Sequence, residues 1–98
     1  MIRHTVMFRW APGTTAADLA SITEGLGGLP AAIPEIRDYR FGHDIGINRD
    51  NFDFVVVADF ADADDYLVYR DQPLHQALLA ERIASHVAER VAVQFDTD

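Results

Sequence analysis

The stretch NFDFVVVADFADADDYLVYRDQPLHQAL, residues 51–78, decides the fold. Residues 52–60 alternate with a period of two, which predicts a β-strand with phenylalanines, Val56 and Ala58 on one face. The acidic segment that follows suits the positive end of a helix dipole, so a short helix should come next. Pro73 breaks that helix, because proline lacks a backbone N–H and its ring clashes with the preceding turn. A strand followed by a helix in two pieces is therefore the centre of the fold.

The segments before this stretch predict two more strands and a helix. IRHTVMFRW, residues 2–10, alternates in the same way and predicts a strand. Thr14 or Thr15 can cap a helix whose apolar residues recur at helical spacing and whose end is weakened by glycines. Two prolines close the connection to EIRDYRFGHDIG, residues 35–46, which predicts the second strand.

The segment after Pro73 predicts a second long helical piece and a closing strand. Residues 74–90 carry apolar side chains at helical spacing, and VAVQFD, residues 91–96, alternates. The resulting order, β-α-β-β-α-β, is the ferredoxin-like split βαβ pattern of an α+β fold. The chain contains no repeat and no linker, so we expect residues 1–98 to form one domain.

The two faces of the predicted sheet differ in what covers them. Both helices should cover one face, because each crossover connection has a fixed hand. The other face would be wet although it carries several apolar side chains, and a second copy packed sheet to sheet would cover them. We therefore expect a homodimer. The pattern assigns Val6, Phe8, Phe41, Phe54, Val56, Val93 and Phe95 to the helix-covered face, and Met7, Ile36, Val55, Val57 and Ala92 to the other.

The composition fits a small globular protein and excludes several classes. Hydrophobic residues make up 49% of the chain, enough for a packed core. The formal net charge of −8 argues against nucleic-acid binding, which needs a basic face. The lack of cysteine excludes disulfides and thiolate metal sites. No segment reaches the roughly 20 apolar residues of a membrane span, and the first residues do not form a signal peptide, so we expect a cytoplasmic protein.

Three stretches, taken in order, resemble the Dabb family, the stress-responsive dimeric α+β barrel domains. They are IRHTVMFRW followed by a Pro-Gly pair, the proline loop and strand ending in Gly-x-Asp at IPEIRDYRFGHDIG, and residues 51–78 with their Pro-x-His turn. The similarity covers essentially the whole chain. It implies a dimeric barrel built from ferredoxin-like subunits.

One branch of that family implies chemistry. In the plant polyketide cyclases similar to olivetolic acid cyclase, a Tyr–His pair runs an aldol closure, and its positions match Tyr69 and His75. A pocket histidine of that branch matches His4. Another pocket histidine of that branch corresponds to Phe54 here, and an aromatic residue late in its last helix corresponds to a position near His86. The pocket is therefore similar in outline but differs in its chemistry.

The resemblance thus implies three catalytic residues. His75 would be the general base, since a helix start lowers a histidine pKa and leaves the ring neutral near pH 7. Tyr69 would donate a hydrogen bond to a developing oxyanion, and His4 would orient the substrate or share protons. The expected substrate-binding residues are Val6, Phe8, Tyr39, Phe41, Phe54 and His86. No histidine or carboxylate set has ligand spacing and no dinucleotide motif occurs, so we expect neither metal nor organic cofactor.

Each candidate also has a purely structural interpretation. His75 can be a partly solvated residue of a first helical turn, and His4 a satisfied core histidine. Tyr69 can be a core aromatic residue, and Tyr66, one turn earlier, competes for its role. Two functions therefore stay open: cofactor-free proton abstraction beside the carbonyl of a small, partly apolar ligand, including aldol-type ring closure, or a non-catalytic stress-associated or ligand-binding dimer. A monooxygenase would rest on the barrel shape alone. A cavity of a few hundred Å³ beside His75 would favour the enzyme, and a filled core the binding protein.

Overall fold

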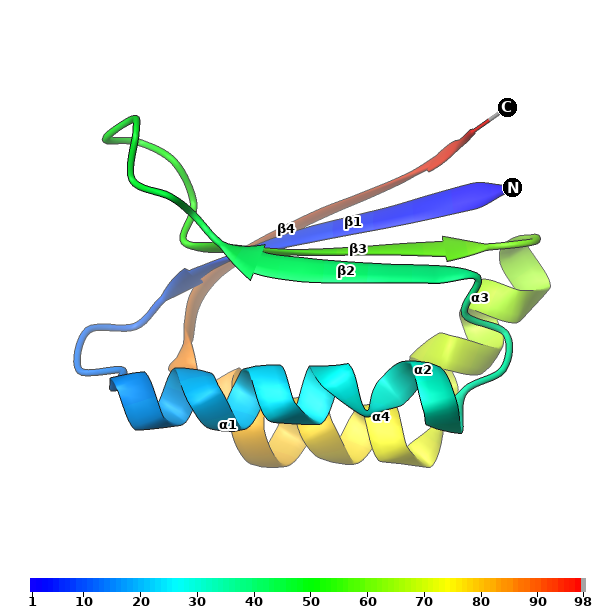
Figure 1. Cartoon of the computed structure of the whole chain (residues 1–98), viewed down its shortest axis with the longest axis horizontal. Helices are drawn as coiled ribbons and strands as arrows, with labels where there is room; N and C mark the ends of the chain where they lie inside the picture. The colour runs from blue at the N-terminus through cyan, green and yellow to red at the C-terminus, as the bar shows by residue number, and fades with distance from the viewer. Residues whose placement is uncertain (98) are drawn as a thin grey trace.

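The computed structural model describes residues 1–97 and has the expected ferredoxin-like order. Four antiparallel strands form one sheet in the order β2-β3-β1-β4, and all the helices lie on one of its faces while the opposite face is bare (Figure 1). The strands are β1 (Ile2–Trp10), β2 (Asp38–His43), β3 (Phe54–Phe60) and β4 (Val87–Asp96). The helices are α1 (Ala16–Gly27), α2 (Leu29–Ala32), α3 (Ala63–Asp71) and α4 (Pro73–Leu78), followed by the π-helical turn η1 (Leu79–Ile83) and the 3₁₀ turn η2 (Ala84–His86).

A capping box starts α1. The Thr15 hydroxyl accepts a hydrogen bond from the backbone N–H of Asp18 at 3.1 Å, and the Asp18 carboxylate accepts one from the Thr15 N–H at 2.9 Å. This reciprocal pair satisfies two N–H groups that a helix start leaves without partners. The sequence left Thr14 and Thr15 open, and Thr15 is the cap. Pro30, expected in the connection, lies instead in the first turn of α2, where a proline costs no hydrogen bond.

The break at Pro73 is confirmed and it positions His75. α3 ends at Asp71, and Gln72 caps α4 by accepting from the backbone N–H of His75 at 3.3 Å. α1 packs closely on this second helical layer at Gly25, where an added Cβ would collide with Cδ1 of Leu78. The glycine therefore permits the close approach of the two helices that enclose the core.

The predicted end of the last helix is wrong. Helical structure was expected through Arg90, but η2 ends at His86 and β4 begins at Val87. Val87 pairs with Trp10, so β4 runs along the whole length of β1. The ladder of backbone hydrogen bonds to β1 overrides the helical spacing of the local sequence.

The predicted assignment of the β4 side chains to the two faces of the sheet is also wrong. The register pairs Thr5 with Val93 and Arg3 with Phe95, so both apolar side chains lie on the bare face, where Val93 is 57% and Phe95 48% exposed. Ala92 pairs with Val6 and lies on the helix side. Alternation shows which residues share a face, but a shift of one residue exchanges the two faces, and only the pairing with β1 fixes it.

The core lies between the sheet and the helices. Aromatic and branched side chains from β1 and β3 pack against α1, α3, α4 and η1, and the bare face keeps Met7, Val55 and Val57 at least partly exposed. The fully buried large side chains are Phe54, Phe60, Ile22, Leu29, Ile33, Ile83 and Val56. The predicted contrast between a covered face and an apolar uncovered face is therefore present.

Candidate functional site

His75 is a nearly buried imidazole in the first turn of α4, with 8% of its surface exposed. Its Nδ1 lies 3.1 Å from the backbone carbonyl of Arg70. A carbonyl oxygen only accepts, so Nδ1 carries the proton in this contact and Nε2 is the unprotonated nitrogen of the neutral ring. Burial lowers the pKa of His75 below its ordinary value, against the opposing effect of hydrogen bonds to the backbone of Arg70 and Tyr69. The ring is thus neutral near pH 7 and its Nε2 can accept a proton.

Tyr69 lies directly against His75. The two rings are stacked with their centroids 4.1 Å apart, and Tyr69 is 4% exposed. The Tyr69 hydroxyl oxygen is 3.0 Å from the hydroxyl oxygen of Tyr39. Burial raises the pKa of both phenols.

The hydrogen bond between these phenols acts on them in opposite directions. It raises the pKa of Tyr39 further and lowers the pKa of Tyr69. Either hydroxyl can donate in this bond. When Tyr39 donates, the Tyr69 proton remains available for another acceptor, and a phenol that accepts one hydrogen bond is a better donor of the next.

His4 is a buried histidine of β1, 4% exposed, on the helix-covered face. The side-chain amide of Gln94 donates to its Nδ1 at 2.7 Å, which leaves the proton on Nε2. Burial, with smaller effects from the positive charge of Arg90 and from His75, lowers the pKa of His4 to about 4. His4 is therefore a neutral hydrogen-bond donor near pH 7, with its ring centroid 6.4 Å from that of Tyr69.

His4, Tyr69 and His75 border a single cavity of about 150 Å³ between the sheet and the second helical layer. The structure thus brings the three expected catalytic residues together. The cavity is open space, but it is smaller than the roughly 300–1,000 Å³ that drug-sized ligands occupy. It therefore suits a compound of a few heavy atoms. The rest of its lining is Val6, Phe8, Leu26, Val56, Tyr66, Arg70, Leu79, Ile83 and Arg90.

The expected substrate-binding residues lie in four different places. Val6 and Phe8 line the cavity, whereas Tyr39 does not line it and contacts the site only through its hydrogen bond to Tyr69. Phe41 and Phe54 border a different pocket instead. His86 lies 3.8 Å from Asp18 and does not line the cavity. The reason is that η1 and η2 depart from α-helical geometry, so a count of α-helical turns from His75 misplaces His86.

Sequence reasoning missed the contribution of β4 to this site. Gln94 orients His4, and Arg90 lines the cavity at the strand residue paired with Phe8. Both side chains follow from antiparallel pairing with β1, so a correct start of β4 would have placed them. Tyr66, weighed as a competitor of Tyr69, also lines the cavity, with its ring centroid 5.0 Å from that of His4.

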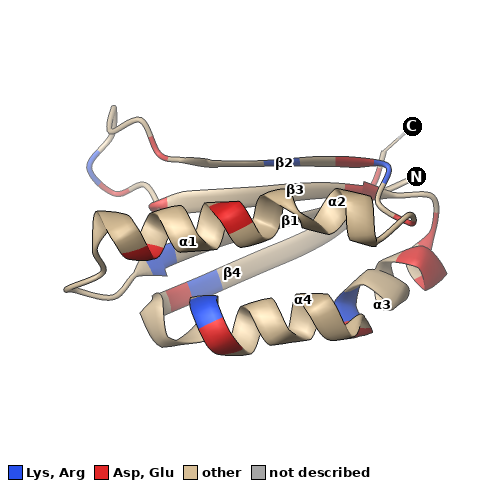
Figure 2. Ribbon diagram, turned by 60° about the horizontal axis from the view of Figure 1, so that its bottom comes forward, with Lys and Arg blue, Asp and Glu red and all other residues tan. Residues whose placement is uncertain are grey.

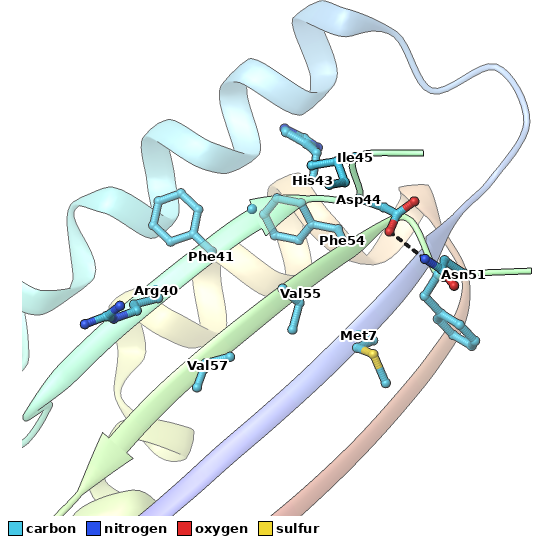
Figure 3. Close-up of a pocket in the computed structure, with 12 residues that line it drawn as sticks. Met7, Arg40, Phe41, His43, Asp44, Ile45, Asn51, Phe54, Val55 and Val57 are labelled. Carbon is cyan, nitrogen blue, oxygen red and sulfur yellow. Dashed lines mark hydrogen bonds between the residues drawn. The ribbon is translucent and has the colours of Figure 1, made fainter. Parts of the chain in front are cut away.

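A larger pocket, of about 600 Å³, opens on the bare face of the sheet. Figure 3 shows Met7, Val55 and Val57 projecting from one side of the strands and the β2–β3 loop at the end of the pocket, held by a 3.0 Å hydrogen bond from Asn51 to Asp44. Its lining is mostly apolar and includes His43 but none of the three catalytic candidates. Its position matches the surface that a second copy is expected to cover.

Residues 1–97 hold no group of three or more histidine, aspartate or glutamate side chains arranged to bind a metal ion. None of the helices in this part of the chain combines the length and the hydropathy that crossing a membrane requires.

Comparison with known proteins points to one family. The model of the stress responsive A/B barrel domain matches residues 2–97. A dimeric ferredoxin-like protein of unknown function from Thermobifida fusca YX is 46% identical, with a TM-score of 0.91 and coverage of 98% of this chain and 90% of that one. Comparison with curated proteins found no match.

Two more distant structures share the fold. A dimeric protein of unknown function from Bacteroides fragilis NCTC 9343 is 22% identical, with a TM-score of 0.85 and coverage of 98% of this chain and 95% of that one. The hydroxynitrile lyase from Passiflora edulis is 20% identical, with a TM-score of 0.86 and coverage of 99% and 93%. At these identities the likeness concerns the fold alone.

Proposed function

The chain belongs to the stress-responsive A/B barrel domain family, as its sequence motifs predicted, and from that premise we propose that it is a homodimer whose subunits run cofactor-free acid–base chemistry beside a carbonyl group. The observation that carries the proposal is the cavity shared by His75, Tyr69 and His4. The mostly apolar lining of this cavity keeps water away, which strengthens hydrogen bonds to a bound carbonyl oxygen. The dimer is supported by the apolar bare face and by the dimeric relative that is 46% identical.

The chemistry begins with proton transfer to His75. Its Nε2 takes a proton from the carbon next to the carbonyl. The C–H bond breaks and its electron pair forms a C=C bond, while the π electron pair of the C=O bond moves to the oxygen. Tyr69 donates a hydrogen bond to the resulting enolate oxygen, and His4 donates from Nε2 to a second polar group of the substrate. The enolate carbon then takes a proton back, or forms a C–C bond to a second carbonyl whose alkoxide receives the proton from His75. The small cavity favours a short substrate over a long polyketide.

A non-catalytic ligand-binding dimer is the second candidate. The small volume of the cavity and the near-complete burial of His75 favour it, since both limit access of a substrate to the base. The two candidates differ in whether a bound carbonyl compound exchanges its protons.

Proton exchange of butanone in D₂O, followed by ¹H NMR, separates them. We expect wild-type protein to accelerate loss of the signals of the protons next to the carbonyl above the buffer rate. The His75→Gln variant, which keeps a polar side chain of similar length, should return the rate to that of buffer with little change in melting temperature. Exchange that is equal in wild type, in the variant and in buffer would contradict the catalytic proposal.

A further inference from the structure

Arg90 is a cation of the cavity that no carboxylate of residues 1–97 neutralises. It lines the same cavity as His75 and Tyr69, and it is the residue of β4 that pairs with Phe8, a core residue of the helix-covered face. Among residues 1–97, no Asp or Glu oxygen forms an ion pair with it, and its side chain makes no hydrogen bond. Its charge is therefore free to bind a ligand.

The acidic neighbour of Arg90 is turned to the other face of the sheet. Figure 2 shows one acidic and one basic segment adjoining near the start of β4, where Glu89 precedes Arg90. Glu89 pairs in register with Arg9 and forms an ion pair with it, at 3.4 Å. Consecutive strand residues point to opposite faces, so Glu89 cannot neutralise Arg90. The other arginine of the cavity, Arg70, is already occupied by Asp71 at 2.8 Å.

What distinguishes the Arg90 guanidinium from the other exposed arginines without an ion pair is its place at the edge of the cavity, in a chain with 16 acidic and 8 basic residues. It is exposed, whereas His4, Tyr69 and His75 are buried, so the cavity is neutral and apolar inside and positive at its mouth. The Arg90 charge lowers the pKa of both His4 and Tyr69, although burial has the larger effect on each. A planar guanidinium with several N–H donors binds a carboxylate through two parallel hydrogen bonds.

We propose that the substrates of this cavity are small oxo acids, whose carboxylate is bound by Arg90 at the mouth while the carbonyl lies inside against Tyr69 and His75. This inference rests on the proposed function and adds the substrate class to it. A carboxylate at the mouth would also fix the orientation of a short substrate in which one end is polar and the other must enter the apolar interior.

The test uses acetoacetate and its uncharged methyl ester as probes. Titration of ¹⁵N-labelled protein with each probe, followed by NMR, gives the two dissociation constants. We expect wild type to bind acetoacetate about tenfold more tightly than the ester, the size of one charge-assisted contact. Arg90→Gln should remove this preference, and Arg90→Lys, which keeps the charge but not the two parallel donors, should retain part of it. Arg37→Gln, which removes an exposed arginine outside the cavity, should retain all of it and so controls for net charge.

The outcomes are separable from those of the butanone assay. Equal affinity of wild type for both probes, unchanged acetoacetate binding by Arg90→Gln, or no saturable acetoacetate binding would overturn the inference. Butanone has no carboxylate, so its exchange tests the acid–base proposal alone. Protein that binds acetoacetate through Arg90 but exchanges no butanone protons would support the inference and contradict the catalytic proposal.

Discussion

The imidazole of His75 is stacked on the phenol ring of Tyr69, with centroids 4.1 Å apart and planes inclined by 29°. Pro73 lies between them in the chain and ends one helical piece before the next begins. Stacking places the base and the hydroxyl donor on one wall of the cavity. A bound carbonyl compound can therefore place its carbonyl oxygen near the Tyr69 hydroxyl and the neighbouring carbon near His75.

Tyr69→Phe should slow butanone exchange by a factor on the order of 10²–10³, the usual effect of losing one oxyanion donor. The ring and its stacking on His75 are kept, so the melting temperature should change little. Exchange rates of the variant and wild type at saturating butanone check this. A rate within a factor of about three of wild type would exclude Tyr69 as the donor, and Tyr66→Phe then tests the neighbouring phenol of the same cavity.

Tyr39→Phe should weaken catalysis indirectly. The hydrogen bond between the two hydroxyls lowers the pKa of Tyr69, so its loss should raise the pKa of Tyr69 and reduce the strength of that phenol as a donor. We expect a drop in the catalytic rate of about tenfold, the value of one hydrogen bond, with an unchanged KM. The pKa of Tyr69, read from the ¹³C shift of its ζ carbon, distinguishes this role from a structural one. A Tyr69 pKa that falls or does not move in Tyr39→Phe would show that Tyr39 does not donate to the Tyr69 oxygen.

Acid should destabilise the protein through His4. Its pKa is lowered from 6.5 to about 4 in the folded chain. Above pH 6.5 the ring is neutral in both states. Below it the unfolded chain takes up a proton that the folded chain resists, so the free energy of unfolding falls until about pH 4. The loss should approach about 2 kcal/mol by pH 4.5.

Urea denaturation of wild type and His4→Gln at pH 7 and pH 4.5, at one protein concentration, measures this contribution. The variant should lose less stability than wild type between the two pH values, since glutamine does not titrate. Equal losses in the two proteins would show that His4 is not held neutral by the fold.

Val57→Glu should convert the dimer to monomers. Val57 belongs to the apolar bare face, and a charge there would be desolvated at a sheet-to-sheet contact, at a cost of several kcal/mol. Light scattering at micromolar concentration should give the mass of a dimer for wild type and of a monomer for the variant. Val68→Glu, at an exposed valine of α3, is the matched control and should remain dimeric. A monomer mass for wild type would contradict the proposed assembly.

The sequence allowed the fold to be predicted where local pattern and pairing agree. The alternation of β1 and β3, a cap at Thr14 or Thr15 and the break at Pro73 all act within a few residues, so they can be identified without knowing the partner strands. The placement of His75, Tyr69 and His4 beside each other followed from the family resemblance and from the alternation of β1. Their catalytic role and a cytoplasmic location stay predictions.

The part of the site that was missed depends on β4. Residues 87–90 have helical spacing in the sequence, and only the ladder to β1 makes them a strand. That register places Gln94 beside His4 and Arg90 at the cavity, and it turns Val93 and Phe95 to the bare face. Such long-range pairing leaves no trace in a local pattern, because alternation is symmetric between the two faces.

The protonation state of His75 decides whether this residue can act as the base, because only a neutral ring with an unprotonated Nε2 can take a proton from a substrate. ¹⁵N NMR of histidine-labelled protein, with the His75 signals identified by their loss in His75→Gln, reports both ring nitrogens as a function of pH. We expect a protonated Nδ1 and an unprotonated Nε2 at pH 7, and a pKa below the ordinary 6.5. A ring that is charged at pH 7, or that carries its proton on Nε2, would contradict the assignment of His75 as the base.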